Sequence, residues 1–205
     1  MNEADDAALP LFPLQAVLFP GGLLALKVFE ARYLDLIGDC LRRRRPFGVV
    51  CLRQGSEAGR GAVRLEPVGT LAHIEDVDGD QAGILRVRCT GGSRFELRAD
   101  PVQQPGGLWV APVRPVADDP VERPAPAMGA TVTALSQAIQ SLKTQDVEPF
   151  LPPFRLDDAG WVANRWCEIL PISLAAKQKL MALESPSLRL QLVDEYLRGK
   201  QVVGG

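Results

Sequence analysis

The chain has 205 residues, 46% of them hydrophobic and 23% charged, which is enough for one large domain or two small ones. Its net charge of -2 gives no general attraction to nucleic acids or anionic membranes, and no apolar run approaches a membrane span in length. The acidic start MNEADDAALP lacks the basic region of a secretory signal. The four cysteines lie far apart within hydrophobic patterns, so we expect buried free thiols and a cytoplasmic location.

The first part of the chain is predicted to form two strands joined by a turn. Leu9–Leu14 (LPLFPL) is predicted to be extended, and its two prolines predict a place away from the centre of a sheet, since proline cannot donate to a ladder. Pro20-Gly21-Gly22 predicts a type II turn, because glycine accepts the positive φ that this turn needs. The alternation of apolar residues from Leu24 to Val28 then indicates a half-buried strand.

From Glu30 the apolar period changes to three and four residues, which predicts an amphipathic helix. Arg42–Arg45 place positive charge at its C-terminal end, and Pro46 prevents its continuation. The following residues 47–52 (FGVVCL) have the composition of a buried strand.

The region from residue 54 to residue 113 is predicted to contain several short strands separated by glycine-containing turns. A polar loop is expected at 54–61, strands at 68–77, 84–89, 95–99 and 109–113, and turns at Asp78-Gly79-Asp80 and Gly91-Gly92-Ser93. Regular spacing of this kind is typical of an antiparallel sheet that closes into a small barrel.

Residues 115–126 (PVADDPVERPAP) combine four prolines with acidic residues, which is typical of a stiff connector. We therefore predict a barrel subdomain at 1–116, a linker at 117–126 and a helical bundle at 127–205. About four helices are expected in the bundle, with Asp157 or Asp158, Ser173 and Ser185 as N-caps and Gly199 as a C-cap.

Several of these segments resemble the N-terminal, substrate-binding domain of Lon proteases. The similar segments are LPLFPL at 9–14, LFPGG at 18–22, FEARYL at 29–34, FGVV at 47–50, VGTLAHIEDV at 68–77, GGSRFEL at 91–97 and LPISLAAKQKLMALESPSLRLQLVDEYL at 170–197. Ala31 stands where the family usually has proline. The resemblance implies an α+β fold, in which a PUA-like pseudo-barrel with one inserted helix precedes a C-terminal helical bundle.

Few residues suggest chemistry. No GxxxxGK[ST] loop occurs, so we expect no nucleotide-binding loop and no cofactor. Lon proteases need an ATPase module and a Ser-Lys protease module, and this sequence leaves room for neither, so we expect neither activity. No metal site is expected, because the four cysteines lack the spacing of metal ligands. His73 is the only histidine, and a structural role is favoured for it. The residues Asp76–Asp80 do not continue as a calcium loop, because Gln81 and Val87 stand where glycine and glutamate would be required. Arg42–Arg45 could contact phosphate, RNA or acidic protein, but a solvated helix end is favoured.

The resemblance favours a non-catalytic module that binds unfolded or degron-bearing protein segments, through a groove between barrel and bundle. The candidate binding residues are Phe29, Glu30, Arg32, Tyr33, Trp161 and Trp166. A separate protease or chaperone is a possible partner. The alternatives are a PUA-like RNA-binding protein, which needs further clusters of Lys and Arg, and an enzyme, which needs a pocket with paired carboxylates of shifted pKa.

Overall fold

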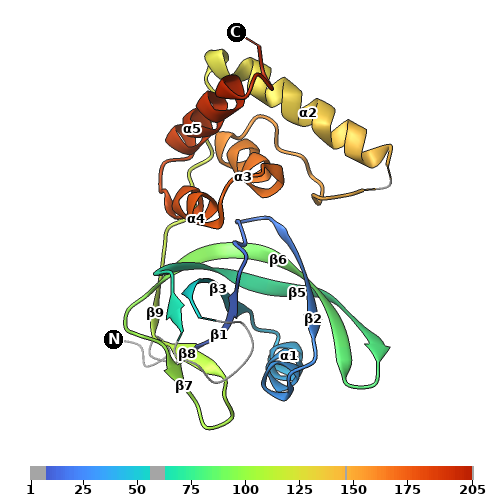
Figure 1. Cartoon of the computed structure of the whole chain (residues 1–205), viewed down its shortest axis with the longest axis vertical. Helices are drawn as coiled ribbons and strands as arrows, with labels where there is room; N and C mark the ends of the chain where they lie inside the picture. Colours follow the sequence, from blue (N-terminus) through green and yellow to red (C-terminus); the bar gives the residue numbers. More distant parts are fainter. Residues whose placement is uncertain (1–7, 56–62, 146, 205) are drawn as a thin grey trace. The chain divides into compact units, whose positions relative to one another are not determined.

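The structure is a computed structural model that describes residues 8–55, 63–145 and 147–204. The chain divides into two compact units, Met1–Ala117 (unit 1) and Asp118–Gly205 (unit 2). The strands belong to unit 1, together with one helix, and the remaining helices belong to unit 2 (Figure 1). Residues 1–7 and most of the loop predicted at 54–61 lie outside the described residues.

Unit 1 is built on one mixed sheet. Its elements are β1 (Leu9–Leu14), β2 (Leu23–Val28), α1 (Ala31–Arg43), β3 (Phe47–Gln54), β4 (Arg64–Leu65), β5 (Val68–Gln81), β6 (Ile84–Leu97), β7 (Val102–Gln103), β8 (Trp109–Ala111) and β9 (Val113–Pro115). In the described part of the chain the nine strands follow the order β2-β6-β5-β3-β1-β8-β7, with β4 against β3 and β9 against β6.

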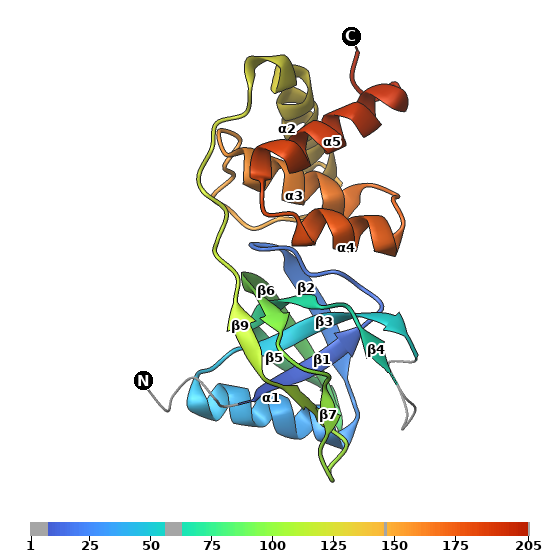
Figure 2. The same ribbon diagram turned by 90° about the vertical axis from the view of Figure 1, so that its left-hand side faces the viewer.

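The sheet curls into a pseudo-barrel without a continuous ladder of hydrogen bonds. β8 pairs with β1 and β9 pairs with β6, and only Pro112 separates β8 from β9. The backbone at Pro112 therefore links a strand paired with β1 to a strand paired with β6, which are not neighbours in the sheet (Figure 2). The predicted α+β pseudo-barrel fold is confirmed, although the β1–β3 pair is parallel rather than antiparallel.

The position predicted for β1 is wrong, because β1 lies inside the sheet between β3 and β8. The register explains how its prolines are tolerated there. Pro10 lies opposite Val110 of β8 and beyond the β3 pairing, whereas Pro13 lies opposite Val50 of β3 and beyond the β8 pairing. Each proline thus lies opposite a paired strand on one side only. On its other side no strand is paired at that position, so the missing N–H leaves no carbonyl there without a donor.

The two longest strands, β5 and β6, form a single hairpin where three shorter strands were predicted, at 68–77, 84–89 and 95–99. The chain reverses after Gln81, and Gly83 has a φ of 80°. The turn predicted at Asp78-Gly79-Asp80 is therefore wrong: Asp78 and Gly79 stay extended and pair with β6. A tight reversal needs positive φ, and Gly83 rather than Gly79 supplies it.

The turn predicted at Gly91-Gly92-Ser93 is also wrong, since these residues lie within β6. A Cβ atom on Gly91 would lie 2.1 Å from the carbonyl oxygen of Phe19, and one on Gly92 would lie 2.5 Å from Nε2 of His73. Glycine is present here because other groups approach the strand closely, not because the chain turns.

The turn and the helix predicted near the start of the chain are confirmed. Gly21 has a φ of 71°, and the N–H of Gly22 donates to the carbonyl of Phe19 over 2.9 Å, as in a type II turn. Helix α1 lies against one end of the curled sheet (Figures 1 and 2). Its apolar face, which includes Tyr33 and Ile37, belongs to the main core cluster of the unit.

Unit 2 consists of η2 (Pro126–Met128), α2 (Gly129–Lys143), α3 (Ala159–Ile169), α4 (Leu174–Ala182) and α5 (Pro186–Gly199). The predicted caps at Asp158, Ser173 and Ser185 are confirmed, because each side chain accepts a hydrogen bond from the first turn of its helix. The predicted C-cap is wrong: Gly199 is still helical, and Lys200 ends α5. Positive φ occurs two residues later, at Gln201, so the conformation that would favour glycine is not at position 199.

Candidate functional site

An apolar groove opens on unit 1 between β1 and β2. It has a volume of about 310 Å³ and is lined by Phe12, Leu14 and Ala16 on one side, by residues 24–30 on the other and by Tyr33 of α1. We call it the β1–β2 groove. Its lining is mostly aliphatic and aromatic, which suits apolar side chains of a ligand.

The groove follows a strand edge that has no neighbour. β2 is the end strand of the sheet and pairs with β6 alone. The N–H of Gly91 donates to the carbonyl of Gly22, and the same register continues along β2. The backbone N–H and C=O groups of the even-numbered residues of β2 therefore point toward β6. The backbone groups of Leu23, Ala25 and Lys27 therefore point to the outer edge, because the two sides of an antiparallel strand alternate. No residue in the described ranges pairs with that edge.

Three of the six predicted binding residues, Phe29, Glu30 and Tyr33, line this groove, and Arg32 supports it. The ring of Phe29 is 60% exposed, while Tyr33 is only 3% exposed and stacks on Phe12 with 3.9 Å between ring centroids. Glu30 pairs with Arg32 over 2.7 Å. The Arg32 guanidinium lies 4.7 Å from the centroid of the Tyr33 ring and donates to the carbonyl of Gly107 over 3.0 Å. Arg32 thus holds Tyr33 in place and does not itself line the groove.

Trp161 and Trp166 lie on α3, in the core of unit 2, and each is 5% exposed. Nε1 of Trp166 donates to the carbonyl of Thr131 over 3.1 Å, and the Trp161 ring contacts Phe150 edge to face. In this conformation both indoles serve helix packing, and a binding role for them stays a prediction.

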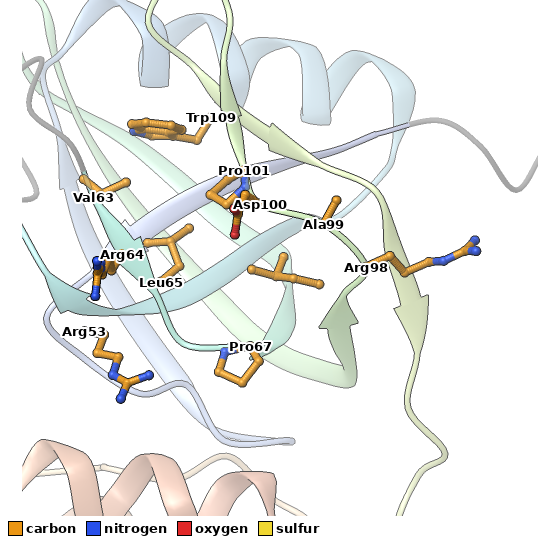
Figure 3. A pocket seen from close by; sticks show the side chains of 11 residues that line it. Arg53, Val63, Arg64, Leu65, Pro67, Arg98, Ala99, Asp100, Pro101 and Trp109 are labelled. Atoms are coloured by element: carbon orange, nitrogen blue, oxygen red, sulfur yellow. The ribbon is translucent and has the colours of Figure 1, made fainter.

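Sequence reasoning missed a second pocket on unit 1, with a volume of about 730 Å³. Figure 3 shows its lining, which includes Arg53, Arg64, Arg98, Asp100 and Trp109. These residues come from different strands and the loops after them, so no local motif in the sequence brings them together.

Three of the four arginines at 42–45 form ion pairs with one carboxylate, that of Asp39. Asp39 accepts from Nη2 of Arg42 over 3.4 Å, from Nε of Arg43 over 2.8 Å and from Arg45. Although desolvation acts in the opposite direction, hydrogen bonds from Arg43 and Arg45 and their charges hold the pKa of Asp39 below its usual value. This arrangement agrees with the favoured interpretation of the run as a helix end.

The thiols are poor nucleophiles near neutral pH. All four cysteines are buried and free, as expected. Burial raises the pKa of Cys51 to about 11 and those of Cys89 and Cys167 to about 12. Little thiolate therefore forms at any of these three positions.

Unit 2 contains a carboxyl group with a strongly shifted pKa, but it is surrounded by cations. Burial raises the pKa of Glu168 to about 7. Nη2 of Arg165 lies 2.7 Å from this carboxylate, and Nζ of Lys177 donates to the Glu168 carbonyl over 3.0 Å. The arrangement differs from the paired carboxylates that acid–base catalysis would use.

His73 is exposed on β5, over Gly92. Across the described ranges, no group of three or more His, Cys, Asp or Glu side chains could hold a metal ion.

In those ranges, too, every helix is too short or too polar to cross a membrane.

Comparisons with known proteins agree with the resemblance seen in the sequence. Residues 8–199 match the family model of the ATP-dependent protease La (LON) substrate-binding domain. The crystal structure of a Lon N-terminal domain protein from Xanthomonas campestris aligns with a TM-score of 0.76 and 32% identity, over 93% of this chain and 98% of that one. The N-terminal domain of a Lon protease from the Mycobacterium avium complex shares the fold, with a TM-score of 0.58, 16% identity and coverage of 94% and 98%.

The chain belongs to the LON substrate-binding domain family. Two curated relatives, a Lon protease from Anaeromyxobacter dehalogenans and Lon protease 2 from Myxococcus xanthus, are each 29% identical over 99% of this chain. The chain spans only 24% and 25% of the lengths of these two relatives.

Proposed function

We propose that this chain is a non-catalytic module that captures unfolded or degron-bearing segments of other proteins in the β1–β2 groove. The family description supports a substrate-binding role, and the curated relatives are proteases that would act on such segments. In this proposal the chain performs no reaction, and a separate protease or chaperone in the cytoplasm receives the bound segment. The comparisons do not favour the RNA-binding alternative.

The observation that carries this proposal is an apolar groove beside an unpaired strand edge. An extended polypeptide can add to such an edge, because its backbone hydrogen-bonds with the outward-facing groups of Leu23, Ala25 and Lys27. Its alternate side chains then point toward the groove. Backbone pairing is independent of sequence, which suits a module that binds many different unfolded segments.

The exposed ring of Phe29 provides a test of the groove. The ligand is a labelled protein that has been reduced and carboxymethylated to keep it unfolded. The Phe29→Ser variant should bind this protein about tenfold more weakly than wild type does, because the variant loses an exposed aromatic anchor. Fluorescence anisotropy measures the dissociation constant. Val102→Ser is the matched control, because Val102 is 63% exposed on the same unit and does not line the groove. Equal weakening by both variants would contradict the proposal.

The strand edge has its own test. Ala25→Pro removes an N–H that faces the free edge and leaves the β2–β6 bonds in place, so it should weaken binding without a large loss of stability. Unchanged binding by Ala25→Pro, with Phe29→Ser still defective, would show that the segment uses the groove but not the edge.

A further inference from the structure

The second pocket of unit 1 carries an unusual distribution of charge. Arg53 belongs to β3, Arg64 to β4, and Arg98 directly follows β6. All three side chains are exposed. Figure 3 shows Arg53 and Arg64 on one side of the pocket and Arg98 on the opposite side. We call this site the arginine pocket.

These three guanidinium groups are available for a ligand. Among the described residues, none of the three side chains is engaged in a hydrogen bond or an ion pair. Other arginines of the unit are engaged, as Arg114 is with Glu96. An unpaired guanidinium can bind a carboxylate through two parallel hydrogen bonds, which is stronger than a contact with a neutral acceptor.

The side chains that line the pocket between the arginines are apolar, except for one carboxylate. Leu65, Leu97 and Trp109 are partly buried and form part of the lining. Asp100 lies between the two sides of the pocket (Figure 3). Its negative charge repels any anionic ligand, and a polypeptide can offset part of this repulsion by offering the carboxylate an N–H group.

We propose that the arginine pocket binds an acidic segment of a partner protein, with carboxylates on both sides of an apolar side chain. The spread of the arginines fits this ligand, since a single phosphate would need convergent donors. The apolar side chain packs on Leu65, Leu97 and Trp109, and the flanking carboxylates reach Arg53 or Arg64 on one side and Arg98 on the other. The arginine pocket and the β1–β2 groove share no lining residue, so either site can be lost without the other.

The test uses the full chain and a fluorescein-labelled peptide with Asp and Glu on both sides of a central leucine. Fluorescence anisotropy should show binding that weakens as salt is added. A twin peptide with Asn and Gln in place of the acids should bind at least about tenfold more weakly. Similar affinity for the two peptides would overturn the proposal.

Substitutions locate the site. Each of Arg53→Gln, Arg64→Gln and Arg98→Gln should weaken binding of the acidic peptide about three- to tenfold, and Asp100→Asn should strengthen it. Arg123→Gln is the matched control, because it removes the same charge from an exposed side chain of unit 2. Circular dichroism is used to check that each variant is folded.

Two results would contradict the proposal. One is an unchanged affinity of all three arginine variants. The other is tighter binding of a labelled single-stranded RNA than of the acidic peptide, with the same dependence on these arginines. Neither result bears on the β1–β2 groove, because Phe29→Ser is assayed separately with an unfolded protein.

Discussion

A side chain at position 91 would collide with the backbone of the turn that precedes β2. The N–H of Gly91 donates to the carbonyl of Gly22 over 2.9 Å, and its own carbonyl accepts from Gly21 over 2.7 Å. A Cβ atom there would lie 2.1 Å from the Phe19 oxygen. Gly91 therefore allows the type II turn to dock on β6, and this docking fixes where β2 and the β1–β2 groove begin.

We expect Gly91→Ala to lower the free energy of unfolding by about 2–3 kcal/mol, since backbone must move to relieve the overlap. Gly79→Ala is the control, because a Cβ atom at Gly79 meets nothing within 4 Å. That variant should lie within about 0.5 kcal/mol of wild type. Urea unfolding followed by circular dichroism measures both, and equal stabilities would show that the approach at Gly91 is not tight.

The two pockets differ in how far residue patterns could predict them. Phe29, Glu30 and Tyr33 fall within one short segment that resembles a known family, so the sequence named three residues that line the β1–β2 groove. It did not predict this groove, because the binding groove was expected between barrel and bundle. Arg53 and Arg98 are distant in the chain and line the same pocket only because the sheet curls. No local pattern marks such a juxtaposition, so the arginine pocket required the structure.

At the scale of elements, helix caps were predictable because they are local. Asp158, Ser173 and Ser185 each bond to a backbone N–H two or three residues ahead. Strand partners are not local. The interior position of β1 and the length of the β5–β6 hairpin depend on which distant strands pair, and neither proline nor glycine content reveals that choice.

The start of α3 gives a direct test of one cap. The sequence left Asp157 and Asp158 open, and the structure assigns the cap to Asp158, whose Oδ1 accepts from the N–H of Gly160 over 3.0 Å and of Trp161 over 3.3 Å. Asp158→Ala should therefore reduce the stability of unit 2 by about 1–2 kcal/mol. Asp157→Ala, at an exposed neighbouring carboxylate, should change it little. Thermal unfolding followed by tryptophan fluorescence compares the two, and the reverse order of effects would contradict the assignment.

At the scale of the whole molecule, each unit has its own stabilising centre. Unit 1 is held by the core clusters of the pseudo-barrel. In unit 2, residues 118–125 form no helix or strand but are attached to the helices. The N–H of Ala159 donates to the carbonyl of Glu122 over 2.7 Å, and Arg189 pairs with Asp119.

Arg189 is the centre of that attachment. Its side chain is 1% exposed and donates to Asp119, to Oδ1 of Asn164 over 3.0 Å, and to the carbonyls of Leu180 and Leu183. One side chain thus joins the segment before η2 to α3, to the end of α4 and to α5. Because a buried guanidinium satisfies all these acceptors, its removal leaves several of them without a donor.

We expect Arg189→Met to destabilise unit 2 by about 3–5 kcal/mol and to leave unit 1 unchanged. Hydrogen exchange read by mass spectrometry separates the two units: peptides from 118–204 should exchange faster, while those from β1 to β9 keep their wild-type rates. Arg123→Met, at an exposed arginine of the same segment, should leave both sets of rates unchanged. Faster exchange in both units of the Arg189 variant would mean that they unfold as one cooperative body. In that case a defect in unit 2 would also open the β1–β2 groove, and binding assays would have to be corrected for it.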